Sequence, residues 1–415
     1  MDSKMTKSDR PMLIGGKLVE SESGEWLESL NPATEEVIGR VPSGSIKDVD
    51  KAVEAASQAQ PEWAALPVGE RGDLLRALAD GLMERAGELL ELEVKDTGNT
   101  IAKMRRDVEK AANLQRYFAG LGLELKGETV PASPGNLHFT VCEPYGVVAR
   151  IVPFNHPISF AAGRLAAPLM AGNSVIIKPP EQAPLSASIL AEVCAQVLPP
   201  GLVNIVTGTG PVAGDAIVRH PGNKRIAFIG SVTTGMMIQR AAAEVGVKHI
   251  TLELGGKNPM IVFPDADLDQ AVRGAVAGMN FTHQGQSCGS TSRLMLHDSI
   301  HDEFLSRDVE RVSALRIGDP MDEQTEMGPM VSAEQLAKTL HYIDAGRQDG
   351  ASLMTGGATP EGAAFERGYI WINGTSSHYL GTPFGGMKNS GIGREEILDE
   401  LRSYTETKTV HVMLN

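Results

Sequence analysis

The stretch Phe228-Ile229-Gly230-Ser231-Val232-Thr233-Thr234-Gly235 passes from an apolar, β-rich run through a glycine turn into a segment of helical character. The N–H groups and the positive dipole end at the start of a helix suit the pyrophosphate of a nucleotide. The two glycines do not follow the Gly-x-Gly-x-x-Gly fingerprint, so a nucleotide would be held in a variant way. An ordinary β–α turn has the same appearance, because glycine punctuates most such turns.

The alternation of β-rich and helical segments continues on both sides of this stretch. From Gly146 onward the β-rich runs are Val147–Val152, Ser174–Ile177, Leu202–Val206, Arg225–Ile229 and His249–Leu252. Helical segments lie between them, for instance Ala187–Val197 and Thr234–Val245. Because strands that alternate with crossover helices form parallel sheets, we predict an α/β fold with a Rossmann-type, doubly wound sheet.

Polar candidates follow four of these predicted strands. Asn155 comes after the first strand, Lys178 and Glu181 after the second, Gly230-Ser231 after the fourth, and Glu253 at the end of the fifth. Ligands of open α/β sheets bind outside the carboxyl ends of the strands. The sequence therefore predicts a single site at this edge.

The segment before this sheet has a different pattern. Residues 11–45 alternate short apolar runs with turns, which predicts a small sheet or arm. From Lys47 the spacing of Val49, Ala52, Val53 and Ala56 predicts a helix, with Ser45 as its N-cap. A second helix is expected from about Glu70, with its apolar stripe on Leu74, Leu75, Leu78 and Leu82.

Composition narrows the classes of function. A chain of 415 residues is longer than the stretch that folds around one ordinary hydrophobic core, so about two or three domains are expected. A net charge of −14 argues against nucleic acid as a partner. Three scattered cysteines indicate a reducing cytoplasm rather than a disulfide framework. We expect no secretory signal in the polar residues 1–10, and no apolar run that could cross a membrane.

Three residues are candidates for covalent chemistry. Cys288 lies in Gly285-Gln286-Ser287-Cys288-Gly289-Ser290, a polar turn with room around the sulfur. Glu253 precedes Gly255-Gly256 and could activate water, while Asn155 is confined between Pro153 and Pro157 and could serve as a preorganised oxyanion donor. The plain alternatives are a small core cysteine, a surface carboxylate and a turn-forming asparagine.

Two further motifs concern cofactors and metals. In Lys178-Pro179-Pro180-Glu181, the lysine can donate to ribose or phosphate, and the carboxylate can accept from ribose hydroxyls and repel a 2′-phosphate; a solvated strand end is the alternative. His297 and His301 could share a helix face, but no third ligand is obvious, so we predict no metal site.

With these residues in hand, the chain resembles the NAD(P)-dependent aldehyde dehydrogenase family. The resemblance rests on motifs in family order, among them Asn31–Glu35, Glu143–Val148, Pro153–Pro157, Lys178–Glu181, Gly230–Gly235, Leu252–Pro259, Gly285–Cys288, Pro383–Gly386 and Tyr404–Glu406. It implies Cys288 as nucleophile, Glu253 as general base, and Asn155 with the Cys288 N–H as oxyanion hole. The implied cofactor contacts are Phe154, Lys178, Pro180, Glu181, Gly210, Gly214, Phe228, Gly230, Ser231 and Leu254.

The resemblance also implies a domain plan. Residues 1–122 and 145–253 would bind NAD, in preference to NADP because of Glu181. Residues 254–395 would form the catalytic domain, and residues 123–144 and 400–415 an oligomerisation arm. His156, Met279 and Phe384 would line the pocket for an aldehyde, and a homodimer or homotetramer is expected.

One interval of the family is missing. Arg367-Gly368-Tyr369-Ile370 runs directly into Trp371-Ile372-Asn373, so the catalytic domain is expected to be truncated near residues 369–371. The Glu-x-Phe-Gly-Pro motif, which clamps the nicotinamide ribose in relatives, is absent. Deleting strands exposes edges and apolar faces. Two alternatives to an NAD-dependent dehydrogenase therefore stay open: an NAD-independent thiol esterase, and a catalytically impaired dinucleotide-binding relative.

Overall fold

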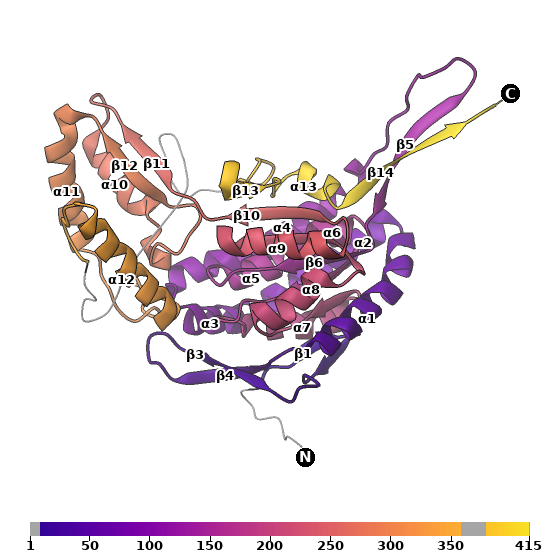
Figure 1. Cartoon of the computed structure of the whole chain (residues 1–415), viewed down its shortest axis with the longest axis horizontal. Helices are drawn as coiled ribbons and strands as arrows, with labels where there is room; N and C mark the ends of the chain where they lie inside the picture. Colours follow the sequence, from indigo (N-terminus) through magenta and orange to yellow (C-terminus); the bar gives the residue numbers. More distant parts are fainter. Residues whose placement is uncertain (1–8, 358–378, 415) are drawn as a thin grey trace.

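The computed structural model describes residues 9–357 and 379–414. The predicted junction near residues 369–371 lies outside these ranges. The centre of the molecule is an eight-stranded sheet in the order β13-β10-β9-β6-β7-β8-β1-β2 (Figure 1). Its strands are β1 (Met12–Ile14), β2 (Lys17–Val19), β6 (Val147–Ile151), β7 (Ser174–Lys178), β8 (Val203–Ile205), β9 (Asn223–Gly230), β10 (His249–Leu254) and β13 (Gly391–Ile392).

Strands β6 to β10 run parallel to one another, which confirms the doubly wound α/β fold. The five predicted β-rich runs agree with these strands to within about two residues at each end. In space, β6 lies between β7 and β9, so the winding direction of the chain reverses at β6. Ligands of such sheets bind at this reversal, outside the carboxyl ends of the strands.

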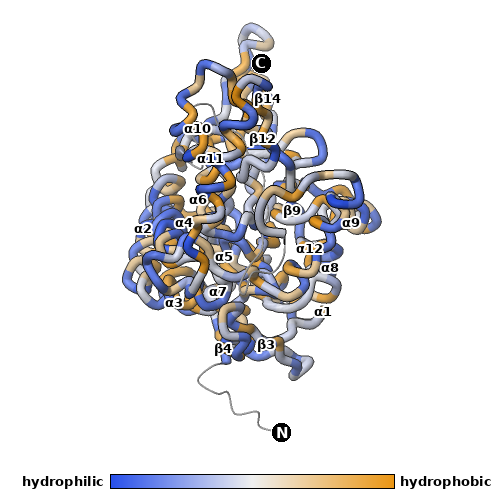
Figure 2. The backbone as a smooth tube through the Cα atoms, turned by 90° about the vertical axis from the view of Figure 1, so that its left-hand side faces the viewer, coloured by the Kyte–Doolittle hydropathy of each residue, from blue (hydrophilic) through white to orange (hydrophobic). Residues whose placement is uncertain are grey.

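Helices cover both faces of the sheet. The helices around it are α1 (Ile46–Ala65), α2 (Val68–Glu84), α3 (Ala86–Thr97), α4 (Ile101–Leu121), α5 (Pro157–Ala161), α6 (Ala166–Met170), α7 (Ser186–Val197), α8 (Asp215–Arg219) and α9 (Val232–Val245). Successive residues of β6 face opposite sides: Val148 packs in one core with α2, α4 and α7, and Ala149 in the other with α1, α8 and α9. Figure 2 shows hydrophilic and hydrophobic positions mixed along these helices, as expected when one face of each is buried.

Helix α1 begins where the sequence predicts. The Ser45 side chain accepts from the Asp48 N–H, and the Asp48 carboxylate accepts from the Ser45 N–H, which completes a capping box. The predicted apolar face of this helix is fully buried at Val49, Ala52, Val53 and Ala56.

The edge of the sheet at β10 is covered by the C-terminal part of the chain. Strand β13 pairs antiparallel with β10, with Ile392 opposite Leu252 and Gly391 opposite Glu253. This pairing brings the chain back to the sheet edge beside the predicted general base.

A smaller unit follows β10. It contains the two-stranded parallel sheet of β11 (Asn258–Val262) and β12 (Thr291–Leu296), with helices α10 (Leu268–Gly278), α11 (His301–Ser313) and α12 (Ala333–Gln348). Its core is small, and Ile261, Phe263 and Met295 on or beside its strands are 59%, 64% and 52% exposed. Helix α12 has no buried residue. These open apolar faces match the expected consequence of the missing interval.

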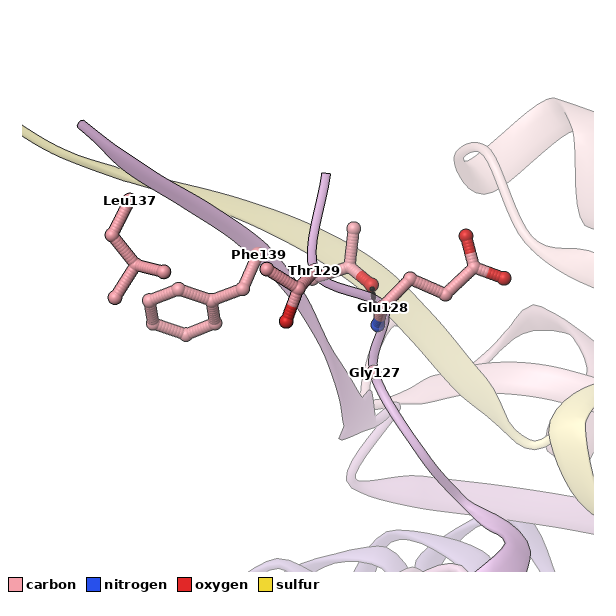
Figure 3. Close-up of a pocket in the computed structure, with 6 residues that line it drawn as sticks. Gly127, Glu128, Thr129, Leu137 and Phe139 are labelled. Atoms are coloured by element: carbon pink, nitrogen blue, oxygen red, sulfur yellow. Dashed lines mark hydrogen bonds between the residues drawn. The ribbon is translucent and has the colours of Figure 1, made fainter. Parts of the chain in front are cut away.

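Two antiparallel ribbons complete the described part of the chain. Strands β3 (Trp26–Leu30) and β4 (Val37–Pro42) form one of them. Strands β5 (Leu137–Pro144) and β14 (Thr405–Val412), the latter after helix α13 (Leu398–Arg402), form an arm that projects from the body on the side opposite to the small unit (Figure 1). A hollow of about 350 Å³ on this arm is lined by Leu137 and Phe139, whose side chains lie on the same side of β5 (Figure 3).

Candidate active site

The three predicted catalytic residues line one large cleft. Asn155 follows β6, Glu253 lies near the end of β10, and Cys288 comes from the loop between α10 and β12. The cleft has a volume of about 1220 Å³ and extends into the small unit, where α11 and α12 form much of its wall. Chain segments far apart in sequence therefore meet at the carboxyl edge of the sheet, as the sequence predicts.

Cys288 is partly buried in a turn that is hydrogen-bonded to β11. The Asn258 side-chain amide donates to the Cys288 carbonyl at 3.3 Å. Burial raises the pKa of the Cys288 thiol to about 11, and the negative charge of Glu253 adds to this effect. The sulfur is therefore protonated at neutral pH in the protein alone, and it needs a favourable positive field to become a nucleophile.

Glu253 is 8% exposed, and its Oε1 has no hydrogen-bond partner among the described residues. Burial and the nearby Glu395 carboxylate raise the pKa of Glu253, while Arg164 and Arg394 oppose this shift. The pKa of Glu253 is thereby raised to about 9, so the carboxyl is protonated at neutral pH in the protein alone and must lose its proton before it can activate water.

Asn155 sits in a stiff segment. Pro157 begins helix α5 directly after His156, and the Asn99 side chain donates to the Asn155 carbonyl at 3.0 Å. Pro153 restricts the other side of the loop. The backbone that carries the Asn155 side chain is thus held before any ligand arrives, which favours a preorganised oxyanion donor.

Five of the predicted cofactor residues gather beyond the ends of β7 and β8. Lys178 closes β7, is 3% exposed and donates from Nζ to the Pro179 carbonyl at 3.0 Å; burial lowers its pKa to about 8. Glu181 accepts from the Gly210 N–H at 2.8 Å. A Cβ on Gly214 would contact the Lys178 side chain at 3.6 Å. Pro180 lies buried between Lys178 and Glu181.

A second group surrounds the start of α9. Ser231 caps this helix by accepting from the Thr234 N–H at 3.1 Å. A Cβ on Gly230 would meet the Phe228 ring at 2.4 Å, so any other residue at the end of β9 would require this ring to move. Gly230, Ser231, Leu254 and Phe154 all line the cleft, whereas Phe228 is buried beneath Gly230.

The predicted substrate residues separate in the structure. Met279 lines the cleft. Phe384 is 7% exposed, bridges to Glu395 through its backbone and is not among the lining residues. His156 is also outside the cleft lining and hydrogen-bonds through Nδ1 to Asp107.

Sequence reasoning missed a buried ionic cluster behind Glu253. Arg164 lies 3.0 Å from Glu395, 3.1 Å from Glu396 and 3.3 Å from Glu400, and Arg150 lies 2.7 Å from Glu395. Burial alone would raise the pKa of Glu395, but Arg164 and Arg150 hold it below its usual range. The partners are more than 200 residues apart in the chain, and no local sequence pattern predicts such ion pairs.

The candidate metal pair from the sequence, His297 and His301, is engaged locally. His297 accepts from the Ser299 N–H at 3.2 Å, and His301 contacts Asp302.

In the described part of the chain, no helix is long and apolar enough to cross a membrane.

Comparisons with known proteins agree with one another. The model of the family described as "Aldehyde dehydrogenase family" matches residues 18–369 and 362–410. Aldehyde dehydrogenase tropH of Talaromyces stipitatus is 42% identical over 465 residues, covering 93% of this chain and 90% of its own. Retinaldehyde dehydrogenase 3 of Mus musculus is 37% identical over 487 residues, covering 100% and 94%.

Solved structures give the same picture. The NAD⁺ complex of an aldehyde dehydrogenase from Bacillus cereus superposes with a TM-score of 0.93 at 33% identity, covering 97% of this chain and 96% of that one. Betaine aldehyde dehydrogenase from Staphylococcus aureus, also with NAD⁺, superposes with a TM-score of 0.94 at 31% identity, covering 98% and 95%.

The alignments also support the missing interval. The comparison with the Mus musculus protein extends over 487 positions, although this chain has only 415 residues. The two matches to the family model meet at residues 362–369, next to the predicted junction. An internal stretch of the catalytic domain is therefore missing.

Proposed function

The chain belongs to the aldehyde dehydrogenase family, and from this premise we propose that it oxidises an aldehyde to a carboxylic acid with NAD, through a covalent intermediate on Cys288. The observation that carries the proposal is the cleft shared by Cys288, Asn155 and Glu253 at the carboxyl edge of the sheet. A thiol, an amide donor and a carboxylate are the groups that thioester chemistry requires.

The residues around the sheet edge fit the adenosine and pyrophosphate parts of NAD. Lys178 and Glu181 would contact the ribose, and the N–H groups at the start of α9 would receive the pyrophosphate. Gly230 lets a ligand approach the backbone closely, because this residue has no side chain that would have to displace the Phe228 ring. The Glu181 carboxylate disfavours a 2′-phosphate, which supports NAD over NADP.

Each step of the proposed reaction is assigned to a residue of this chain. Cys288 Sγ, once deprotonated, attacks the carbonyl carbon of the aldehyde. The Asn155 side chain donates to the oxygen on which negative charge develops. NAD, when bound, supplies the acceptor for the hydride that leaves this carbon. Glu253 then takes a proton from the water that hydrolyses the thioester, which frees Cys288 and releases the acid.

A thiol esterase that does not use NAD is the second candidate. It is favoured by the absent Glu-x-Phe-Gly-Pro motif, since the three catalytic candidates remain while the family's nicotinamide-ribose clamp is lost. A relative that binds the dinucleotide without chemistry is the third. Hydride transfer is sensitive to misplacement of about 1 Å, so the loss of a clamp bears on the reaction rate.

We also propose that the β5–β14 arm joins two or more copies of the chain. A two-stranded ribbon is marginally stable alone in water. This arm carries exposed apolar side chains, among them Leu137, Val412 and Leu414. A second copy of the chain would cover them.

The three free cysteines are consistent with a reducing compartment such as the cytoplasm, which we propose as the location of the protein.

Stopped-flow measurement of NADH formation with a panel of aldehydes tests the proposed function. We expect a burst of NADH that Cys288→Ala lowers by at least about 10³-fold, whereas Cys142→Ala on the arm leaves it unchanged. Asn155→Ala should lower the rate by about 10²- to 10³-fold. Hydrolysis of nitrophenyl esters without NADH formation would favour the esterase, and full turnover by Cys288→Ala would overturn the proposed covalent step on Cys288.

A further inference from the structure

Two histidines and an aspartate meet at a point outside the Cys288 cleft. Asp107 comes from α4, His156 directly precedes α5, and His283 ends the 3₁₀ helix Phe281–His283. One ligand-type atom of each residue lies within 4.8 Å of those of the other two. None of the three is among the residues that line the cleft. The cluster is therefore separate from the site of the proposed reaction.

The spacing within the cluster is close to that of a metal site. The Asp107 carboxylate contacts Nδ1 of His156, and the rings of His156 and His283 lie 4.3 Å apart between centroids. Ligand atoms around a tetrahedral Zn²⁺, each at about 2.0–2.1 Å from the ion, lie roughly 3.4 Å from one another. The limit of 4.8 Å leaves the ligand atoms within about 1.5 Å of this separation, a shift that rotation of an imidazole ring can supply.

His283 gives a second, independent indication of a ligand. This residue is 1% exposed, and its Nε2 has no hydrogen-bond partner among the described residues. Its Nδ1 lies 3.5 Å from the Thr282 hydroxyl, which can accept the Nδ1 proton and leave the lone pair on Nε2. A buried nitrogen with an unused lone pair costs stability, and a bound metal ion would recover this cost.

The protonation states of the cluster suit a cation. Burial would raise the pKa of Asp107, but His156, Lys103 and Lys110 lower it, so the carboxylate is ionised at neutral pH. Burial, together with His156 and Lys103, lowers the pKa of His283 well below its usual range, so this ring is neutral. An ionised carboxylate and a neutral imidazole are the forms in which these side chains bind metals.

Lys103 is the group that opposes a cation at this place. It lies one turn before Asp107 on α4, and burial lowers the pKa of its ammonium while Asp107 raises it. Because the net shift is downward, Lys103 loses its proton more readily than a solvated lysine, which limits the repulsion. Lys110, the next lysine on α4, already pairs with Glu396 at 2.7 Å. Lys103 therefore weakens a cation site without abolishing it.

The donor set selects the class of ion. Two imidazole nitrogens and one carboxylate oxygen suit Zn²⁺ and the neighbouring divalent transition metals, whereas Mg²⁺ and Ca²⁺ prefer oxygen ligands throughout. The sequence-based prediction of no metal site rested on His297 and His301, which stand after β12 and take no part in this cluster.

We propose that Asp107, His156 and His283 bind one divalent transition-metal ion such as Zn²⁺, which ties two loops of the candidate active site to α4. His156 directly follows Asn155, and His283 stands in the same segment as Cys288, between α10 and β12. The ion has a structural role here. The proposal does not depend on the proposed function, because neither NAD nor an aldehyde takes part in it.

Zn²⁺ titration of the chelator-treated chain, in competition with a chromophoric chelator, tests the site. The wild-type chain is compared with the double variant Cys142→Ala/Cys288→Ala, which lacks the two partly exposed thiols that could also bind Zn²⁺. We expect both proteins to bind one Zn²⁺ at this site with a dissociation constant below about 10 µM. Co²⁺ in the double variant should give the ligand-field absorption bands of a tetrahedral site.

Substitutions in the double variant assign the ion to the cluster. Asp107→Asn, His156→Phe and His283→Leu should each weaken Zn²⁺ binding by at least about tenfold. Lys103→Met should instead tighten binding by about threefold or more, because it removes a like charge. Damage to the fold would not tighten binding, so this variant separates a metal site from a merely structural cluster.

His411→Ala on the arm is the matched control. His411 and His138 lie opposite one another on β14 and β5, with their Nδ1 atoms 2.5 Å apart. This second pair of close imidazoles is a competing place for an ion, and it lies on the projecting arm. We expect His411→Ala to leave the dissociation constant of Zn²⁺ unchanged.

Several results would overturn the proposal. They are a dissociation constant above about 10 µM, unchanged binding by His283→Leu, weaker binding by Lys103→Met, and loss of binding in His411→Ala, which would place the ion on the arm. Hydrogen exchange gives an independent check and shows whether each variant is folded. Zn²⁺ should slow exchange in the peptides that contain His156 and His283, and equal rates with and without the ion would contradict the link to α4.

Discussion

The sheet of β6 to β10 and the small unit of β11 and β12 are built from similar strands, yet they differ sharply in how these strands are covered. In the sheet, every residue of β6 and β7 is buried between two helical layers. In the small unit, Ile261 and Met295 remain more than half exposed, although both lie on strands. The comparison shows that strand sequence alone does not secure burial, because burial also depends on the elements that pack against the strand.

The candidate active site spans both regions. Asn155 and Glu253 come from the well-covered sheet, and Cys288 comes from the poorly covered unit. The precision of the catalytic geometry therefore depends on how firmly the second region is held against the first. The following predictions test that difference in order of expected effect.

The largest effect is expected from the buried ionic cluster. Arg164→Met leaves Glu395, Glu396 and Glu400 without a main cationic partner, and uncompensated buried charges cost about 3–5 kcal/mol. Urea unfolding followed by circular dichroism should show this loss. The exposed pair of Arg116 with Asp80 at 2.7 Å is the matched control, and Arg116→Met should cost less than about 1 kcal/mol. Equal losses in the two variants would contradict the difference.

An alanine pair compares the two regions directly. Ile177 in β7 is fully buried, and Ile177→Ala should destabilise the sheet by about 2–5 kcal/mol. Ile261 in β11 is 59% exposed, and Ile261→Ala should change stability by no more than about 0.5 kcal/mol. Hydrogen exchange of peptides from each region measures the two values in the same samples. A large cost at Ile261 would mean that another part of the chain or a second copy covers this face.

The smallest effect concerns the state of Cys288. With the pKa of its thiol raised to about 11, the thiolate fraction in the NAD-free protein should rise about tenfold per pH unit between pH 8 and 10. The alkylation rate of Cys288 by iodoacetamide should rise by the same factor. Glu253→Gln removes a like charge, which lowers the pKa of the thiol and should speed alkylation at pH 10. A rate that levels off below pH 9 would show that the sulfur is less shielded than the geometry indicates.

The parts that the sequence predicts are those with local signals. The β-branched runs predict β6 to β10, and Ser45 with Asp48 predicts the start of α1. The edge rule for parallel sheets places Asn155, Glu253 and the predicted nucleotide-binding residues together from the sequence alone. The truncation is also visible in the sequence, because family motifs that are normally separated stand side by side.

The remaining features depend on long-range pairing. Arg164 meets Glu395 and Glu400 across more than 200 residues, and the rings of His156 and His283 meet across more than 100 residues. Neither pair has a spacing pattern, because partners brought together by the fold leave no periodicity in the chain. The pairing of β13 with β10 was also not predicted, since a two-residue strand is too short to recognise.

The pairing of β13 with β10 has a consequence for modular engineering. Gly391 and Ile392 pair with Glu253 and Leu252, so this end of the sheet edge is covered without the missing interval. The corresponding interval of a full-length relative could therefore be inserted at the junction. This insertion would restore the motif that holds the nicotinamide ribose in relatives, while the rest of this chain stays unchanged.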